Sequence, residues 1–261
     1  MQGRMNLQRG IYFELLQAWT RRIIQARYQQ SLLGGLWAII QPGAQALMFS
    51  IVFTQAIRVD NGNIPYLLFS YVAMVPWSFF AGSLTDMVGS QVDNLNLVTK
   101  IYFPREILPM AGLLARLLDF AIAMGLFVLL ALFFHLPLFS LAWIYLPVIL
   151  TIQVMLALGI GLIGAALNVF YRDIKHLLAL GLQLWLYASP VIYPVSVVQE
   201  RLRAFYFLNP MAGIIESYRA VLLNGNAPEP YLILAGLIAL GTLLVGYWFF
   251  KRVEFQFADV I

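Results

Sequence analysis

Two oppositely charged residues, Arg116 and Asp119, interrupt an otherwise apolar segment at residues 107–134. Residues three apart lie on one face of a helix. If the segment spans a membrane, each charge costs about 2.5–3.5 kcal/mol on insertion scales, and pairing lowers that cost. The spacing therefore predicts an intramembrane charge pair. It either faces a translocation path or a partner helix, or it is a structural ion pair inside the bundle.

The chain lacks the sequence motifs of proteins that hydrolyse a nucleotide or bind a metal. No glycine is followed by lysine, so the phosphate-binding loop is missing. Gly159, Gly161 and Gly164 match a dinucleotide motif by letters alone, inside an apolar run with no strand before it. Cysteine is absent, and His135 and His176 are predicted at opposite membrane faces. We expect no catalytic residue, no metal and no cofactor in this chain.

Aromatic residues make up 15% of the chain. Most are expected to anchor at the membrane interface or to pack inside the bundle. Aromatic faces can also stack on the C–H face of a sugar ring, so a lining of rings would let a polar polymer slide. One subset lies near prolines, where the backbone is expected to be irregular. We predict that it lines a substrate path: Trp77, Phe80, Trp185, Tyr187 and Tyr193.

Two loops differ from ordinary connections. The first, at residues 86–106, mixes apolar and polar residues and is long for a connector, which favours a function. It predicts a short helix that docks on something in the cytoplasm; the alternative is a simple turn with a partly buried helix. The second loop contains Asn168, Arg172 and Asp173. Its charges are either functional or mere interface anchors.

The composition identifies the class of protein that must position these residues. Of 261 residues, 62% are hydrophobic and 11% charged, with a mean hydropathy of +0.82. Soluble domains carry about 25% charged residues, so a soluble enzyme, a disordered chain and a nucleic-acid binder are excluded. The isoelectric point near 9.4 comes from bases spread along membrane flanks. The sequence predicts an all-α integral membrane protein.

Segments nearly free of charge predict six transmembrane helices, because about 20 mostly apolar residues cross the hydrocarbon core. Pro190 and Pro194 end the fifth segment, which could turn back before it crosses fully. Two short amphipathic helices are expected to follow at the outer surface, within residues 190–230. The first segment begins near residue 36. The six segments are 36–57, 61–85, 107–134, the part of the uncharged run 120–171 that follows the break at 135–140, 176–193 and 231–250.

The distribution of Lys and Arg predicts the orientation. With the N terminus inside, the cytoplasmic segments hold 11 basic residues and the outer segments hold four. Both termini are therefore expected in the cytoplasm. The domains are an N-terminal cytoplasmic segment (residues 1–35), a transmembrane domain (36–250) and a cytoplasmic tail (251–261).

The N-terminal segment has the periodicity of an amphipathic helix. Apolar residues from Ile11 to Ala26 recur at helical spacing, with Glu14, Arg21 and Arg22 largely opposite. The pattern favours a helix that lies in the inner membrane interface. The alternative is a helix packed on the protein's own loops.

Several of these segments, in this order, resemble a known family over nearly the full length of the chain. The family is the membrane subunit of ABC-type polysaccharide exporters, which includes O-antigen, teichoic acid and capsule export permeases. The resemblance rests on the amphipathic N terminus followed by Trp37 and QP at 41–42, KIYFPREILP at 100–109, NVFYRDI at 168–174, SPVIYP at 189–194, LNP at 208–210 and FQFADVI at 255–261.

The resemblance implies a half-transporter in the bacterial inner membrane, embedded in membrane lipid. Two copies would form a homodimer, and two copies of a separate ABC ATPase subunit would bind ATP and Mg beneath it. The outer helices, in the region at residues 190–230, would form an external gate. The substrate would be a lipid-linked glycan of the undecaprenyl diphosphate type, and nucleic acid is not an expected partner. The loop at 86–106 would contain the helix that couples to the ATPase, with these contact residues: Met87, Val88, Val92, Leu95, Lys100 and Arg105.

Two other functions remain open at this point. One is a small-molecule or drug exporter of the same permease superfamily. The other is a passive channel or membrane scaffold that works without an ATPase. An adjacent gene for a Walker-motif ATPase would exclude the passive channel, and neighbouring glycan-synthesis genes would favour the polysaccharide.

Overall fold

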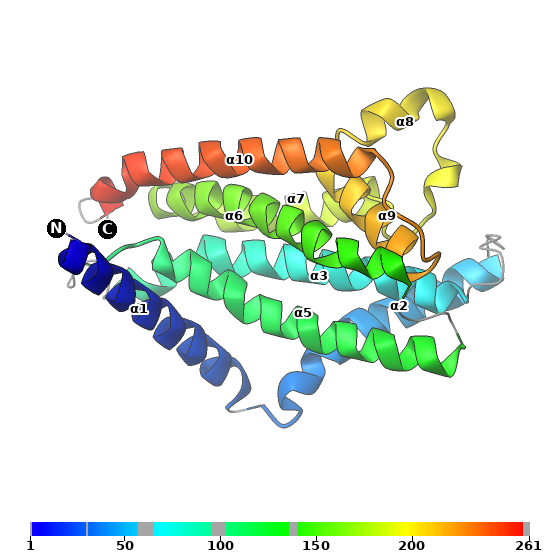
Figure 1. Cartoon of the computed structure of the whole chain (residues 1–261), viewed down its shortest axis with the longest axis horizontal. Coiled ribbons are helices and arrows are strands. Elements are labelled where there is room, and N and C mark those ends of the chain that lie inside the picture. The colour runs from blue at the N-terminus through cyan, green and yellow to red at the C-terminus, as the bar shows by residue number, and fades with distance from the viewer. Residues whose placement is uncertain (1, 30, 57–64, 96–102, 136–139, 258–261) are drawn as a thin grey trace.

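The protein is an elongated bundle of helices (Figure 1). The computed structural model describes residues 2–29, 31–56, 65–95, 103–135 and 140–257. These residues form helices and no strands, which confirms the predicted all-α class. Both termini lie at the same end of the bundle, and we call this the terminal end (Figure 1).

Five helices in the described part are long and apolar enough to cross a membrane. Each begins or ends within a few residues of a predicted span. They are α2 (Trp37–Ala56, preceded by the 3₁₀ turn η1, Gly34–Leu36), α3 (Tyr66–Gly89), α5 (Ile107–Phe133), α6 (Leu146–Phe170, preceded by η3, Leu141–Tyr145) and α10 (Tyr231–Val253, followed by η5, Glu254–Gln256).

The predicted fifth span corresponds to α7 (Ile174–Ala188), which has 15 residues. At 1.5 Å per residue it is about 22 Å long, which is shorter than the hydrocarbon core of about 30 Å. Ser189 has an extended backbone and Pro190 follows it, so the helix ends here. Helix length and apolarity therefore support five spans in the described part, and the sixth span stays a prediction.

The centre of the bundle is α3, whose residues are mostly buried against α2, α5 and α6. Pro76 lies inside this helix, and its carbonyl accepts a hydrogen bond of 2.7 Å from Nε2 of Gln153 on α6. The hydroxyl of Tyr218 donates to Oε1 of Gln153 at 3.1 Å. The amide of Gln153 is thus satisfied on both sides, as a buried polar group requires.

Glycines allow α6 and α10 to approach closely. A Cβ atom on Gly159 would lie 2.5 Å from the carbonyl oxygen of Thr242, and one on Gly246 would overlap the carbonyl of Gly159. Small residues at a helix–helix interface permit such close backbone contact in membranes. The glycine string in α6 therefore serves helix packing.

The N-terminal helix α1 (Gln2–Tyr28) runs obliquely along the half of α5 that lies nearer the terminal end of the bundle (Figure 1). Leu16 and Trp19 from its predicted apolar face are buried in the core, whereas Ile11 is 56% exposed. Part of the face expected to contact lipid thus packs on the protein instead, because α5 offers apolar surface there. The helix packs on α5, which is a helix and not a loop, and it leaves Ile11 and Phe13 exposed, so its place in the membrane interface stays a prediction.

Short helices occupy the end of the bundle opposite the termini (Figure 1). After the turn at 189–194 come η4 (Val195–Val197), α8 (Glu200–Tyr206) and α9 (Pro210–Leu222). Asn209 caps α9, since its side chain accepts a hydrogen bond from the backbone N–H of Met211 and Pro210 occupies the first turn. Two short helices are therefore present in the predicted region, and their role as a gate stays a prediction.

Candidate functional site

Four charged side chains from three helices meet in one cluster, which we call the charge ring: Arg27 of α1, Asp86 of α3, and Arg116 and Asp119 of α5. Arg27 lies 2.5 Å from Asp86 through Nη2 and 2.5 Å from Asp119 through Nη1. Nε of Arg116 lies 2.7 Å from Asp86, and its Nη1 lies 3.6 Å from Asp119. Each carboxylate contacts both guanidinium groups. With two arginines and two aspartates, the ring is formally neutral.

The charge ring contains the predicted pair and two residues that sequence reasoning missed. Arg116 and Asp119 do approach each other, but theirs is the longest of the four contacts. Arg27 carried one usable signal, as the basic residue in the last turn of a predicted helix. Asp86 was expected at the start of a loop and lies inside α3 instead. The ring joins the end of α1 to α3 and α5.

Tyr28 adds a hydrogen bond to the ring, because its hydroxyl donates to Oδ1 of Asp119. Burial raises the pKa of Tyr28 to about 12, and the hydrogen bond to Asp119 adds to this shift. The phenol therefore remains protonated, and able to donate, across the physiological pH range.

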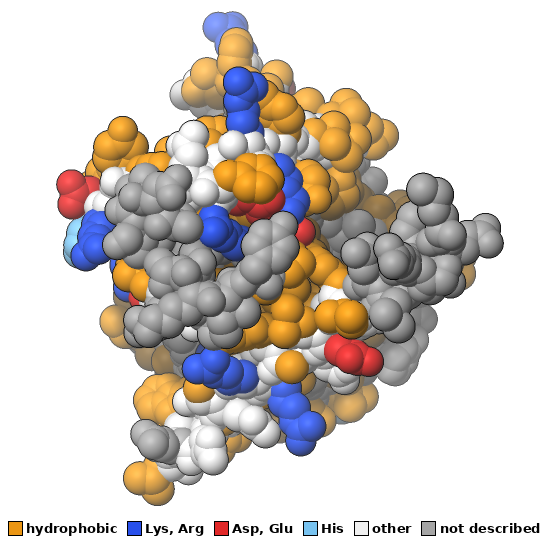
Figure 2. Space-filling model, turned by 90° about the vertical axis from the view of Figure 1, so that its left-hand side faces the viewer, with side chains coloured by type: hydrophobic (Ala, Val, Ile, Leu, Met, Phe, Trp, Pro, Cys, Tyr) orange, Lys and Arg blue, Asp and Glu red, His pale blue; other side chains and the backbone are white. Residues whose placement is uncertain are grey.

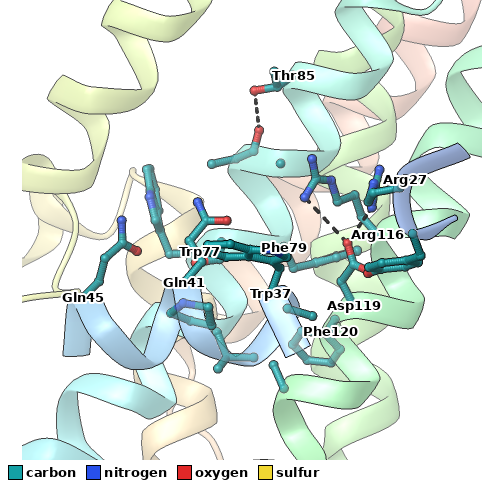
Figure 3. Close-up of a pocket in the computed structure, with 18 residues that line it drawn as sticks. Arg27, Trp37, Gln41, Gln45, Trp77, Phe79, Thr85, Arg116, Asp119 and Phe120 are labelled. Carbon is teal, nitrogen blue, oxygen red and sulfur yellow. Dashed lines mark hydrogen bonds and ion pairs between the residues drawn. The ribbon is translucent and has the colours of Figure 1, made fainter. Parts of the chain in front are cut away.

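A cavity of about 490 Å³ opens beside the charge ring, between α1, α2, α3 and α5. Figure 3 shows that Trp37, Gln41 and Gln45 of α2 lie on one side of it, with the ring at one end. Trp77 and Phe79 belong to α3. Gln41 and Gln45 are one helical turn apart and exposed, so both amides can reach a molecule in the cavity.

The five residues of the predicted substrate path do not line one surface. Only Trp77 lines this cavity. Its ring and that of Phe80 contact the ring of Trp185, with centroids 6.5 Å and 5.2 Å apart. Phe80 is fully buried, so it packs α3 against α7.

The remaining path residues lie at the end of α7. The hydroxyl of Tyr193 donates to the carbonyl of Tyr187 at 3.1 Å, and Tyr187 is exposed. Nε1 of Trp185 donates to Oδ1 of Asn209 at 2.8 Å. These contacts tie the end of α7 to the start of α9, and the path itself stays a prediction.

The turn at 189–194 is held by buried polar contacts. Arg219 of α9 donates to the carbonyl of Val191 at 3.0 Å and to Glu216 at 2.7 Å. Its guanidinium also lies 3.6 Å from the ring centre of Phe69 on α3. Tyr66 donates to the carbonyl of Ile192. Backbone carbonyls that α7 no longer satisfies thus find partners on α3 and α9.

The predicted docking residues differ in where they lie. Met87 and Val88 are buried at the end of α3, where they pack against Gly161 and Gly164 of α6. This placement differs from the expectation of a docking surface, because α3 continues to Gly89. Val92, in the 3₁₀ turn η2 (Val92–Asn94), and Leu95 are partly exposed. Lys100 lies outside the described residues.

Arg105 ties this loop to the end of α10. Its guanidinium donates to the carbonyl of Glu254, and its own carbonyl accepts a 2.8 Å hydrogen bond from Gln91. Nζ of Lys251 lies 2.8 Å from Glu106 and 3.1 Å from Glu254. These contacts join residue 91, which directly precedes η2, to residues 105–106 and 251–254.

The second predicted loop is split in the same way. Asn168 is buried and donates to the carbonyl of Val88 at 2.9 Å, which fixes α6 to α3. Arg172 and Asp173 are exposed in the turn between α6 and α7. Figure 2 shows the terminal end, where Lys and Arg side chains are scattered among apolar ones.

Comparison with known proteins gives one family. The ABC-2 type transporter family matches residues 14–223. The chain is 29% identical to the O-antigen export system permease protein RfbA of Klebsiella pneumoniae, over the full length of both chains. It is 33% identical to RfbA of Myxococcus xanthus, over 88% of this chain and 87% of that protein. The polysialic acid transport protein KpsM of Escherichia coli is 24% identical, over 89% of this chain and 91% of KpsM.

Proposed function

Because the chain belongs to the ABC-2 type transporter family, we propose that it is the membrane subunit of an exporter that moves a lipid-linked, O-antigen-like polysaccharide across the bacterial inner membrane. The observation that carries the proposal is the match to RfbA of Klebsiella pneumoniae along the whole of both chains. The match therefore covers the sequence of every helix described here.

The energy would come from a separate ATPase subunit. The sequence has no phosphate-binding loop, so ATP and Mg would bind to that partner. Among the described residues of the proposed docking surface, Val92 in η2 and the adjacent Leu95 are partly exposed. Through Gln91, Arg105 and Lys251 the motion of this turn would reach α10.

Two copies of the chain would form the translocation channel. In the described part, α2 buries little of its surface within one chain. It exposes apolar residues such as Ile40, Leu47 and Ile51 beside the polar Gln41 and Gln45. A second copy would cover the apolar residues and leave the amides facing a hydrated path, and two-fold pairing is the commonest closed symmetry. Both termini would lie in the cytoplasm, in line with the 11-to-4 distribution of basic residues.

Deletion of the gene in its host tests this function. We expect the surface polysaccharide to disappear and undecaprenyl-linked polymer to accumulate in the cytoplasm, and a plasmid copy of the gene to reverse both effects. An unchanged surface polysaccharide, with increased sensitivity to small drugs instead, would replace this function by that of a small-molecule exporter.

A further inference from the structure

We propose that the cavity between α1, α2, α3 and α5 is a subsite for uncharged sugar units of the exported glycan, an inference that rests on the proposed function. Its volume of about 490 Å³ lies within the range of small-molecule sites. It lies inside one chain, so each copy in a dimer would carry its own subsite.

The lining combines the two kinds of contact that a sugar ring needs. Trp37 and Trp77 offer aromatic surface from α2 and α3, against which the C–H face of a sugar can lie. Gln41 and Gln45 offer amides that both donate and accept hydrogen bonds, as hydroxyl groups do. A purely apolar molecule would leave these amides without partners, which disfavours it.

The charge ring selects against anionic sugars. Two arginines and two aspartates make the ring formally neutral, and each aspartate already contacts both arginines. A sugar carboxylate at the ring would have to displace Asp119 from Arg27 or Arg116, which would place three carboxylates around two partly buried guanidinium groups. An uncharged sugar meets no such cost, so it is the favoured occupant.

The position of the cavity suits an early step of transport. Arg116 lies nine residues, or about 14 Å, from the start of α5, and α5 starts at the terminal end (Figure 1). The proposed ATPase docks at that end. The subsite would therefore hold sugar units soon after they enter, while aromatic and amide contacts keep the binding weak enough for release.

The test uses the host's own glycan. Fragments are released from the polymer that accumulates in the deletion strain, and half of them are oxidised at primary hydroxyls to carboxylates. Binding of both to the full-length chain in lipid nanodiscs is measured by equilibrium dialysis. We expect the untreated fragments to be uncharged and to bind. The double substitution Gln41→Leu/Gln45→Leu should weaken binding roughly tenfold, the effect of losing one or two hydrogen bonds. Oxidation should also weaken binding, because a sugar carboxylate would have to displace Asp119 from an arginine.

Gln183→Leu is the matched control, because Gln183 is exposed on α7 outside the cavity lining. Trp37→Leu is a second cavity variant and should weaken binding without loss of folded protein, since Trp37 is 52% exposed. Anionic native fragments, undiminished binding after oxidation, or wild-type affinity in both cavity variants would each overturn the subsite. A deletion strain that accumulates no polymer would instead refute the proposed function.

Discussion

Arg27 and Asp86 are 59 residues apart in the sequence, yet Nη2 of the arginine lies 2.5 Å from Oδ2 of the aspartate. This contact closes the charge ring and fixes the end of α1 against α3. The N-terminal helix is thereby held both by apolar packing, through Leu16 and Trp19, and by ion pairs. We expect it to behave as part of the bundle.

Neutralising Arg27 should destabilise the folded protein. Arg27→Gln leaves Asp86 and Asp119 with one guanidinium between them, and an unsatisfied, partly buried group costs about 1–3 kcal/mol. The melting temperature of the purified protein in detergent measures the loss. Arg21→Gln, at an exposed position of the same helix, is the control and should melt like the wild type. Equal melting temperatures for the two variants would mean that the ring does not hold α1.

The contact between α6 and α10 predicts a difference between two glycines of one helix. Gly246→Ala places a Cβ against the carbonyl of Gly159, and such overpacking costs about 1–3 kcal/mol. Gly241→Ala meets open space and should be neutral or slightly stabilising, since alanine favours helices. Thermal unfolding of both variants checks this. A Gly246→Ala protein as stable as Gly241→Ala would show that the helices do not pack this closely.

Because some predicted docking residues are buried and others partly exposed, we expect their substitution to have two different effects. Val92→Asp changes a partly exposed side chain and should leave the folded protein intact while export is uncoupled from ATP hydrolysis. Met87→Asp buries a carboxylate against Gly161 and should reduce the amount of folded protein itself. The readouts are surface polymer per folded transporter and the ATPase rate of the complex. Normal export from Val92→Asp would argue for a plain connector.

Arg219 should be required for the turn at 189–194. Arg219→Met removes the hydrogen bond to the carbonyl of Val191 and leaves Glu216 without its partner, at a cost of about 1–3 kcal/mol. We expect a lower melting temperature together with faster protease cleavage within the turn. Arg201→Met, on the exposed side of α8, is the control. If both variants resist the protease equally, Arg219 does not stabilise the turn.

The long helices could be predicted because runs of about 20 apolar residues can be read directly from the order of residues along the chain. The end of α3 could not be predicted from the sequence, for an electrostatic reason. Asp86 looked like the end of a span, since an unpaired charge does not continue into a membrane. Arg27 and Arg116 neutralise it, so the helix continues through Met87 and Val88 to Gly89. The partner that explains this lies on α1, and no local pattern connects the two helices.

The site was predicted less well than the fold. Trp77, predicted to line a substrate path, lines the cavity, whereas Phe80 is buried by tertiary packing that proline spacing does not reveal. The cavity itself depends on how the end of α1 packs against α5 and α3, which the sequence did not indicate. Arg105 was expected to contact an ATPase, and the structure also connects it to Glu254 at the far end of the chain.

The most direct test of the account is ATP-driven transport in inverted inner-membrane vesicles that contain this chain and its ATPase subunit. Lipid-linked glycan is added outside, and the fraction protected from a glycosidase is measured with ATP and with a non-hydrolysable analogue. We predict that protection appears only with ATP and disappears in vesicles with the Val92→Asp chain. Equal protection with the analogue would identify a passive channel, and protection that is absent under both conditions would contradict glycan export.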